Sequence, residues 1–210
     1  MIYRKLCAGL CAGVLWCGVN AASAAIVIQT IPVPGQSLLS GITTNTTTPF
    51  DIVSFFDKFD LSLGLLTSVR FDFTYNFQLS LDLPAEGGGG SGSAGGPIFV
   101  QGDNPPGAGG GNGNGGGGPP STTVVIPILV SGNFQVDTNL DPYLATLPGQ
   151  QGIFDFNAAV NVAPSPGVTG AMLLQGTSSV QVTFTYTPVP EPAAAGLLSL
   201  GLFVLTRRRR

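Results

Sequence analysis

The sequence predicts an all-β protein, an antiparallel β-sandwich of jelly-roll-like form. Its strongest signal is a strict alternation of apolar and polar residues over positions 69–83. The same alternation returns over 154–162 and 180–186. A period of two gives a strand one buried face and one exposed face. No comparable helical period appears between residues 25 and 188, so we expect two sheets that bury their apolar faces against each other.

Further strands follow from shorter stretches of the same pattern, at 26–31, 123–130 and 134–137. As a single strand, the alternation at 69–83 would be roughly 50 Å long. We therefore expect it to bend, to carry a bulge or to divide into two strands at a corner. Pro127 has no backbone N–H, which predicts an edge strand or a bulge at that position.

Residues 86–120 interrupt these strands with a tract rich in glycine and proline. Such a segment has too little apolar surface to offset the entropy lost on ordering it. We therefore predict a flexible insertion, with room for a short tethered strand at 98–100. Three glycines in the tract match a dinucleotide-binding pattern, but no strand precedes them and no helix follows, so no cofactor site is predicted. They are Gly111, Gly113 and Gly116.

Residues 1–24 are predicted to be a signal peptide. A basic start at Arg4 and Lys5 is followed by an apolar run at 6–19. This run is shorter than the roughly 20 residues that a membrane-spanning helix needs, so removal is favoured over a permanent anchor. The small side chains of Ala22 and Ala24 occupy the positions that signal peptidase recognises, and cleavage is expected before Ala25.

The mature chain lacks the residues on which many catalytic sites depend. Cys7, Cys11 and Cys17 all lie within the predicted signal peptide, and the chain has no histidine. Ser-His-Asp and Cys-His catalytic sites, disulfides and thiolate-ligated metals are therefore excluded. Carboxylate chemistry stays open, as a paired-acid hydrolase or as oxygen-ligated calcium.

The body of the chain is acidic. The 8 basic residues include Arg4, Lys5 and the four arginines at 207–210, and the 11 acidic residues include Glu191. The remaining 2 basic and 10 acidic residues give residues 25–188 a net charge of −8. Such a surface repels nucleic acid and anionic lipid, so nucleic acid is excluded as a partner.

Two pairs of acids are the candidate calcium ligands, Asp57 with Asp60 and Asp137 with Asp141. Their spacing matches no EF-hand loop, and solvated turn residues are the favoured interpretation. We predict no catalytic, cofactor-binding or metal-ligating residue. Trp16 leaves with the signal peptide, which weakens the case for a sugar-stacking site without closing it.

Residues 188–210 form a tripartite segment, in which a proline-flanked acid precedes an apolar run at 193–206 and an arginine cluster. As a helix the run would be roughly 21 Å long, shorter than the roughly 30 Å hydrocarbon core. Pro190 and Pro192 oppose its extension toward the N-terminus. The arginines are expected to stay on the cytoplasmic side. A span this short suits a temporary attachment better than a permanent anchor.

This segment resembles the PEP-CTERM protein-sorting signal. The residues that carry the resemblance are Pro190, Glu191, Pro192, Arg207, Arg208, Arg209 and Arg210, with the apolar run between them. The resemblance implies cleavage near the tripeptide by an exosortase, an integral-membrane cysteine peptidase or transpeptidase. It also implies a Gram-negative, exopolysaccharide-producing bacterium whose sorted proteins reach the cell surface or the biofilm matrix.

Residues 58–69 resemble the opening of the choice-of-anchor E domain. The resemblance rests on Lys58-Phe59-Asp60, Ser62-Leu63-Gly64 and Leu66-Thr67-Ser68-Val69. It implies an extracellular, β-rich domain of unassigned activity.

The expected organisation is a signal peptide at 1–24, an extracellular sandwich at 25–187 and a sorting signal at 188–210. We expect an exported surface or extracellular-matrix protein with a structural or adhesive role in biofilm, without catalysis or cofactor. Its expected partners are signal peptidase, exosortase and, transiently, the inner membrane. One alternative is an exopolysaccharide-binding module, with or without calcium. A carboxylate-dependent hydrolase is the other, and it requires two aspartates that converge.

Overall fold

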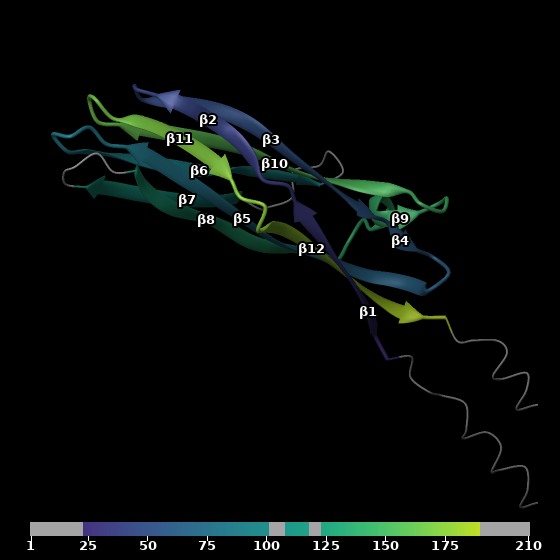
Figure 1. Cartoon of the computed structure of the whole chain (residues 1–210). Helices are drawn as coiled ribbons and strands as arrows, with labels where there is room; N and C mark the ends of the chain where they lie inside the picture. Colours follow the sequence, from purple (N-terminus) through teal and green to yellow (C-terminus); the bar gives the residue numbers. More distant parts are fainter. Residues whose placement is uncertain (1–22, 101–107, 118–122, 190–210) are drawn as a thin grey trace, which may run out of the picture.

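The structure is a computed structural model that describes residues 23–100, 108–117 and 123–189. It is almost entirely β-sheet, as the alternation predicted, and the strands of both main sheets pair antiparallel (Figure 1). Sheet A consists of β1 (Ala25–Val33), β2 (Gln36–Ile42), β5 (Gly64–Asp82), β8 (Thr123–Val136), β11 (Thr169–Leu174) and β12 (Ser178–Pro188). Sheet B consists of β3 (Thr46–Asp57), β10 (Gln151–Pro164), β6 (Gly88–Val100) and β7 (Ala108–Gly117).

Three short elements lie near one end of the sandwich. They are β4 (Phe59–Asp60), β9 (Leu144–Ala145) and the 3-10 helix η1 (Asp141–Tyr143). Strands β4 and β9 pair in parallel, unlike the strands of the two main sheets. In the part of the chain that the structure describes, no helix is long and apolar enough to cross a membrane.

Strand β5 organises sheet A. One edge of β5 pairs with β12 along its first half and with β11 along its second, and its other edge pairs with β8. The long alternation is therefore one undivided strand, with a register shift against β12 near its start. The strands beside it are interrupted instead: β11 is separated from β12 near Gly176, and β1 is separated from β2 near Gly35. These two interruptions lie side by side, because a Cβ on Gly35 would lie 2.8 Å from the backbone nitrogen of Gly176.

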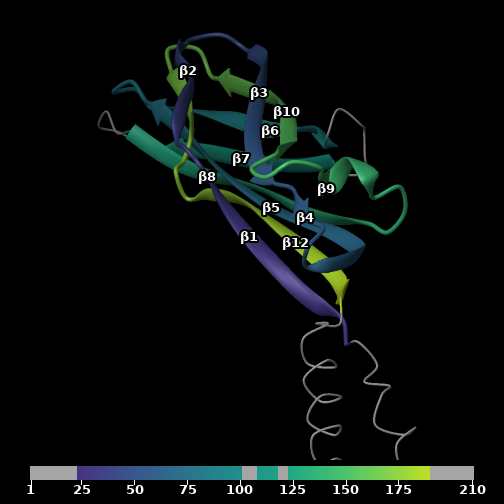
Figure 2. The same ribbon diagram turned by 90° about the vertical axis from the view of Figure 1, so that its right-hand side faces the viewer.

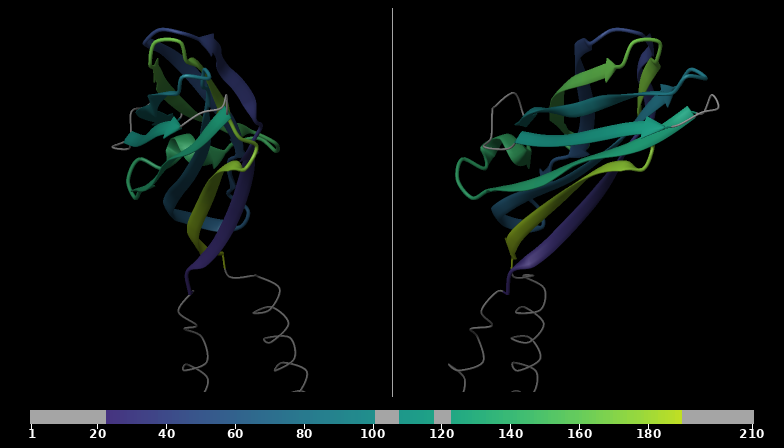
Figure 3. Two further views of the ribbon diagram at one scale, coloured as in Figure 1. Left: turned by 60° about the vertical axis from the view of Figure 1, so that its left-hand side comes forward. Right: turned by 90° about the vertical axis from the view of Figure 1, so that its left-hand side faces the viewer.

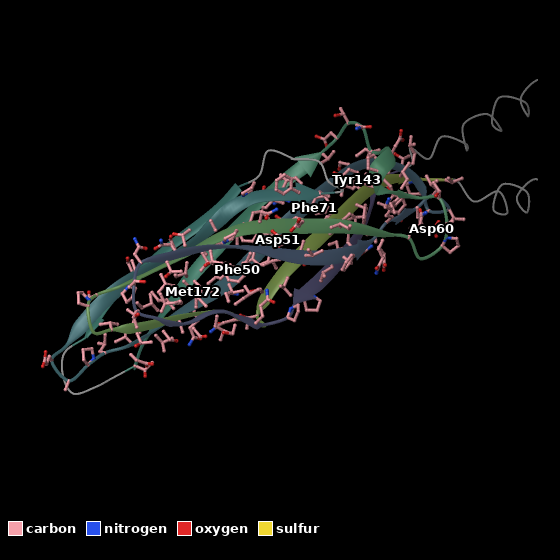
Figure 4. All side chains as sticks on the ribbon, turned by 90° about the horizontal axis from the view of Figure 1, so that it is seen from above. Phe50, Asp51, Asp60, Phe71, Tyr143 and Met172 are labelled. Carbon is pink, nitrogen blue, oxygen red and sulfur yellow. The ribbon has the colours of Figure 1, made fainter. Side chains whose placement is uncertain are left out.

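Figure 3 shows the two sheets packed against each other. The side chains on their inward faces form the core. The alternating apolar residues of β5, β10 and β12 point inward, as predicted. Aromatic rings fill one part of the core, with Phe71 at their centre (Figure 4). Tyr75 continues this packing, since its ring stacks on Phe156 at 4.7 Å between centroids.

The prediction of a flexible insertion at 86–120 was wrong for most of the tract. Residues 88–100 form β6, which pairs with β10, and β7 pairs with β6 over its whole length. The apolar surface that covers β6 comes from other strands. A Cβ on Gly92 would lie 2.9 Å from Leu79 Cδ2 and 3.0 Å from Met172 Cε. Glycine thus lets the backbone lie directly against large side chains of sheet A.

One side chain joins the edges of the two sheets. The Nε2 of Gln29, in β1, donates to the carbonyl oxygen of Asp57, in β3, at 2.9 Å. The backbone N–H of Asp57 donates back to Gln29 Oε1, also at 2.9 Å. These bonds satisfy edge-strand backbone groups that would otherwise invite pairing with another chain.

Both ends of the described chain leave from the same end of the sandwich. The first residue of β1, Ala25, pairs with Tyr186 near the end of β12. The two strands run side by side to that end (Figure 2). Segments that precede β1 and follow β12 in the sequence therefore begin close together.

Candidate functional site: an acidic and apolar face of sheet B

The predicted targeting residues lie mostly outside the described residues. Ala22, Pro190, Glu191, Pro192 and the arginines at 207–210 fall there. Ala24 is exposed just before β1, and Ala25 is the first residue of that strand. The expected cleavage position thus adjoins the folded body directly.

One member of each acid pair named from the sequence has a local hydrogen-bond partner. Asp60 accepts a hydrogen bond from the backbone N–H of Ser62 at 2.8 Å, and this bond lowers the pKa of its carboxyl. Asp137 accepts a hydrogen bond from Gln135 Nε2 at 2.7 Å. Among the described residues, no group of three or more acids could hold a metal ion. These contacts favour a turn role for Asp60 over calcium ligation.

A different pair of carboxylates meets on the outer face of sheet B. Asp155 pairs with Val53 across β10 and β3, and Asp51 pairs with Asn157, so the two acids are diagonal neighbours. Partial burial raises the pKa of Asp155, and the charge of nearby Asp51 raises it further. The Oδ1 atom of Asp155 is itself buried and has no hydrogen-bond partner. No sequence pattern marks this pair, because only the pairing register of β3 and β10 brings the two residues together.

Apolar side chains flank this pair on the side of Asp155, whereas Asp51 lies opposite the polar Asn157. Val53, Phe55 and Ile153 are 44–53% exposed, although each is large and apolar. Phe55 lies opposite Ile153 in the ladder, and Phe99 lies opposite Asp155. We call this surface the acidic–apolar face, formed by Asp51, Val53, Phe55, Phe99, Ile153 and Asp155. Asp51 lies about midway along the molecule (Figure 4).

The outer face of sheet A also exposes large apolar side chains, on β1, β8 and β11: Ile26, Ile28, Val125, Leu129 and Leu173. Its centre differs, because it carries Thr74, Gln181 and Thr183, with a bidentate ion pair between Arg70 and Asp72. Arg70 and Lys58 are the basic residues of the described part of the chain, and neither belongs to the acidic–apolar face. That face therefore combines negative charge with exposed apolar surface and has no basic residue to neutralise it.

Replacing Asp155 with asparagine is expected to stabilise the protein at neutral pH. A raised pKa means that the folded state binds the proton more tightly than the unfolded chain, so stability rises as the pH falls through the folded pKa. The asparagine side chain mimics the protonated acid at every pH. We expect a gain of at most about 1 kcal/mol at pH 7, because solvent screens a half-exposed group. The gain should vanish below the ordinary pKa of an aspartic acid in an unfolded chain, about 3.9.

Urea denaturation of both proteins from pH 3 to pH 7 measures this difference. Asp137→Asn serves as a control, since that carboxylate already has a hydrogen-bond donor in Gln135. Parallel stability curves for wild type and Asp155→Asn across the range would contradict the assignment.

Comparisons with known proteins add no family. No family model matches the chain, and no curated protein sequence matches it. The alignment with the structure of infectious bursal disease virus Gt strain covers 88% of this chain and 48% of the viral chain, at 14% sequence identity and a TM-score of 0.15. The alignment with the crystal structure of the infectious bursal disease virus VP2 subviral particle covers 90% of this chain and 50% of the viral chain, at 13% identity and a TM-score of 0.12. The chain spans about half the length of these chains, and TM-scores this low carry no argument.

Proposed function

We propose that this is an exported protein, sorted to the cell surface or extracellular matrix, where it has a structural and adhesive role. The acidic–apolar face carries the adhesive part of the proposal. Large exposed apolar side chains beside one exposed and one partly buried carboxylate on the same sheet face are typical of an interaction surface. The sorting part rests on the resemblance of residues 189–210 to the PEP-CTERM signal.

The arrangement of the strands supports a jelly-roll assignment. Counting β1 with β2 and β11 with β12 as single strands, and leaving out β4 and β9, gives eight strands in chain order. Sheet A then has the order 1-8-3-6, and sheet B has the order 2-7-4-5. This is the order of a double-sheet jelly roll, a fold that other proteins use in capsids and lectins. The fold is compatible with adhesion and specifies no ligand.

Deleting residues 190–210 is expected to move the protein from the surface and matrix fractions of its host to the periplasm or the medium. The deletion removes the proposed recognition and cleavage segment and leaves the whole described sandwich intact. Immunoblots of cell, matrix and medium fractions measure the shift. An unchanged distribution would rule out the sorting proposal.

The same fractionation tests the acidic–apolar face. A Phe55→Ser/Ile153→Ser variant should still be exported but should be lost from the matrix fraction. The matched control is Val125→Ser/Leu129→Ser, since these residues are similarly exposed (53–56%) but lie on β8 in sheet A. Full matrix retention of the Phe55→Ser/Ile153→Ser variant would rule out the adhesive role of this face.

A second candidate function is exopolysaccharide binding by the same face. Phe99 lies opposite Asp155 and Phe55 lies diagonally across from it, so both offer ring surfaces beside a carboxylate. The carboxylates of Asp155 and its neighbour Asp51 accept hydrogen bonds from hydroxyl groups. Retention on host exopolysaccharide, with and without a chelator, distinguishes this function from protein-mediated adhesion. Release of the protein by the chelator would indicate calcium-dependent binding. If the protein is not retained in either condition, exopolysaccharide binding is ruled out and adhesion through another protein is the remaining function.

A further inference from the structure

One end of the sandwich exposes a cluster of aliphatic side chains outside the core. These residues, which we call the leucine end, are Leu61, Leu63, Leu65, Leu147 and Val189, and they are 41–70% exposed. Isolated exposed leucines are common, but a cluster at one point on the molecule indicates a surface that meets something apolar.

Backbone contacts join Leu63, Leu65 and Val189, and strand pairing places the turns with Leu61 and Leu147 at the same end of the sandwich. The N–H of Val189 donates to the carbonyl oxygen of Leu63 at 3.4 Å. Leu65 lies opposite Thr187 in the ladder between β5 and β12. Because β4 and β9 are parallel, the turns that follow them, at 61–63 and 146–150, lie at the same end. Figure 4 shows Asp60, the residue before Leu61, at this end of the molecule.

The sequence that continues from this end identifies the occupant. Val189 belongs to the leucine end and is followed by three residues and then by the apolar run at 193–206. Because only three residues join the leucine end to this apolar run, the leucine end lies next to the membrane when the run is inserted there. The inference rests on the proposed function, in which a membrane holds the run before cleavage.

We propose that the leucine end rests on the lipid surface, so that Val189, the last described residue, lies at the level of the headgroups. Aliphatic side chains on a folded domain partition into the boundary between headgroups and acyl chains. The exposed carboxylate of Asp60, which accepts a hydrogen bond from the backbone N–H of Ser62, limits this contact to the headgroup layer. Since the body is acidic, an uncharged lipid surface is the fitting partner. The proposed cleavage segment therefore begins where a membrane-embedded peptidase works.

The mature chain, residues 25–210, has no cysteine, so a single fluorescent label can report on this contact. The label is an environment-sensitive dye on Ser62→Cys, in the turn between Leu61 and Leu63. The control label is on Thr43→Cys, in the turn after β2. Residues Ile42 and Leu81 both pair with Gly170, so the control lies about 50 Å along β5 from Leu65.

Each labelled protein is mixed with phosphatidylcholine vesicles that carry a nitroxide quencher near the headgroups, and flotation measures attachment. We expect a blue shift and quenching at position 62, and neither at position 43. The Leu61→Ser/Leu63→Ser/Leu65→Ser variant should still float, through residues 193–206, but should lose the quenching at position 62.

Several outcomes would overturn the inference. Flotation without quenching at position 62, or quenching that survives the triple serine change, would show that lipid does not cover the leucine end. Equal quenching at both positions would mean that the body lies flat on the surface. A blue shift without vesicles would assign the leucine end to a second copy of the chain. A chain that fails to float contradicts the membrane-held intermediate itself, and so the proposed function.

Discussion

Phe71→Ala is expected to destabilise the sandwich by about 3–5 kcal/mol, the usual cost of deleting a buried aromatic ring. Phe71 is completely buried on β5. Its ring centroid lies 5.0–5.9 Å from four other aromatic rings, which come from both sheets and η1: Phe56, Phe134, Tyr143 and Phe154. These neighbours are fixed by separate strands and cannot all move into the space, so much of the cavity would remain.

Urea denaturation followed by circular dichroism measures the loss. The expected result is a lower midpoint with an unchanged slope, since the surface exposed on unfolding stays nearly the same. Phe50→Ala is the matched control. Phe50 lies at the margin of the core and is only partly buried, so its loss should be clearly smaller (Figure 4). Equal losses at the two positions would contradict a central role for Phe71.

Gly96→Ala is expected to separate β6 from β10 locally. A Cβ on Gly96 would lie 1.8 Å from the carbonyl oxygen of Asn157 and 2.9 Å from its carbonyl carbon. No side-chain rotation relieves a clash with the backbone, so one of the two strands must move. Overpacking of this kind costs about 1–3 kcal/mol. The loss extends to β7, which depends on β6 for its place in sheet B.

Limited proteolysis of residues 86–120 and the urea midpoint report on this separation. We expect faster cleavage within the tract for Gly96→Ala than for wild type. Gly176→Ala is the control, because the nearest atom to its new Cβ would be Gly35 N, at an ordinary contact distance of 3.6 Å. Cleavage at the wild-type rate would show that the backbones adjust without parting.

Much of the strand content was predictable, for a specific physical reason. Alternation records which side chains face the core, so the patterns at 69–83, 154–162 and 180–186 correspond to β5, β10 and β12. The edge position inferred from Pro127 is confirmed, because β8 pairs with β5 alone among the described strands. Strands β2, β3 and β11 lack a clean alternation and were not predicted.

The glycine tract shows where reasoning from local composition fails. Its own side chains are too small to form a core, so composition predicts flexibility. In the fold, Leu79, Leu81 and Met172 of sheet A supply the apolar surface, and the glycines provide room for it. The order of β6 therefore depends on residues that are distant from it in sequence.

The sequence by itself determined that the protein is all-β, which faces of its principal strands are buried, and that its body is acidic and lacks histidine. These properties are local, since each is carried by the residue types and their spacing. Only the tertiary structure decided that Asp51 and Asp155 meet beside apolar side chains, that the glycine tract joins sheet B, and that the leucine end adjoins the start of the segment after Val189. These features depend on the register and order of strands far apart in the chain, which no local pattern encodes.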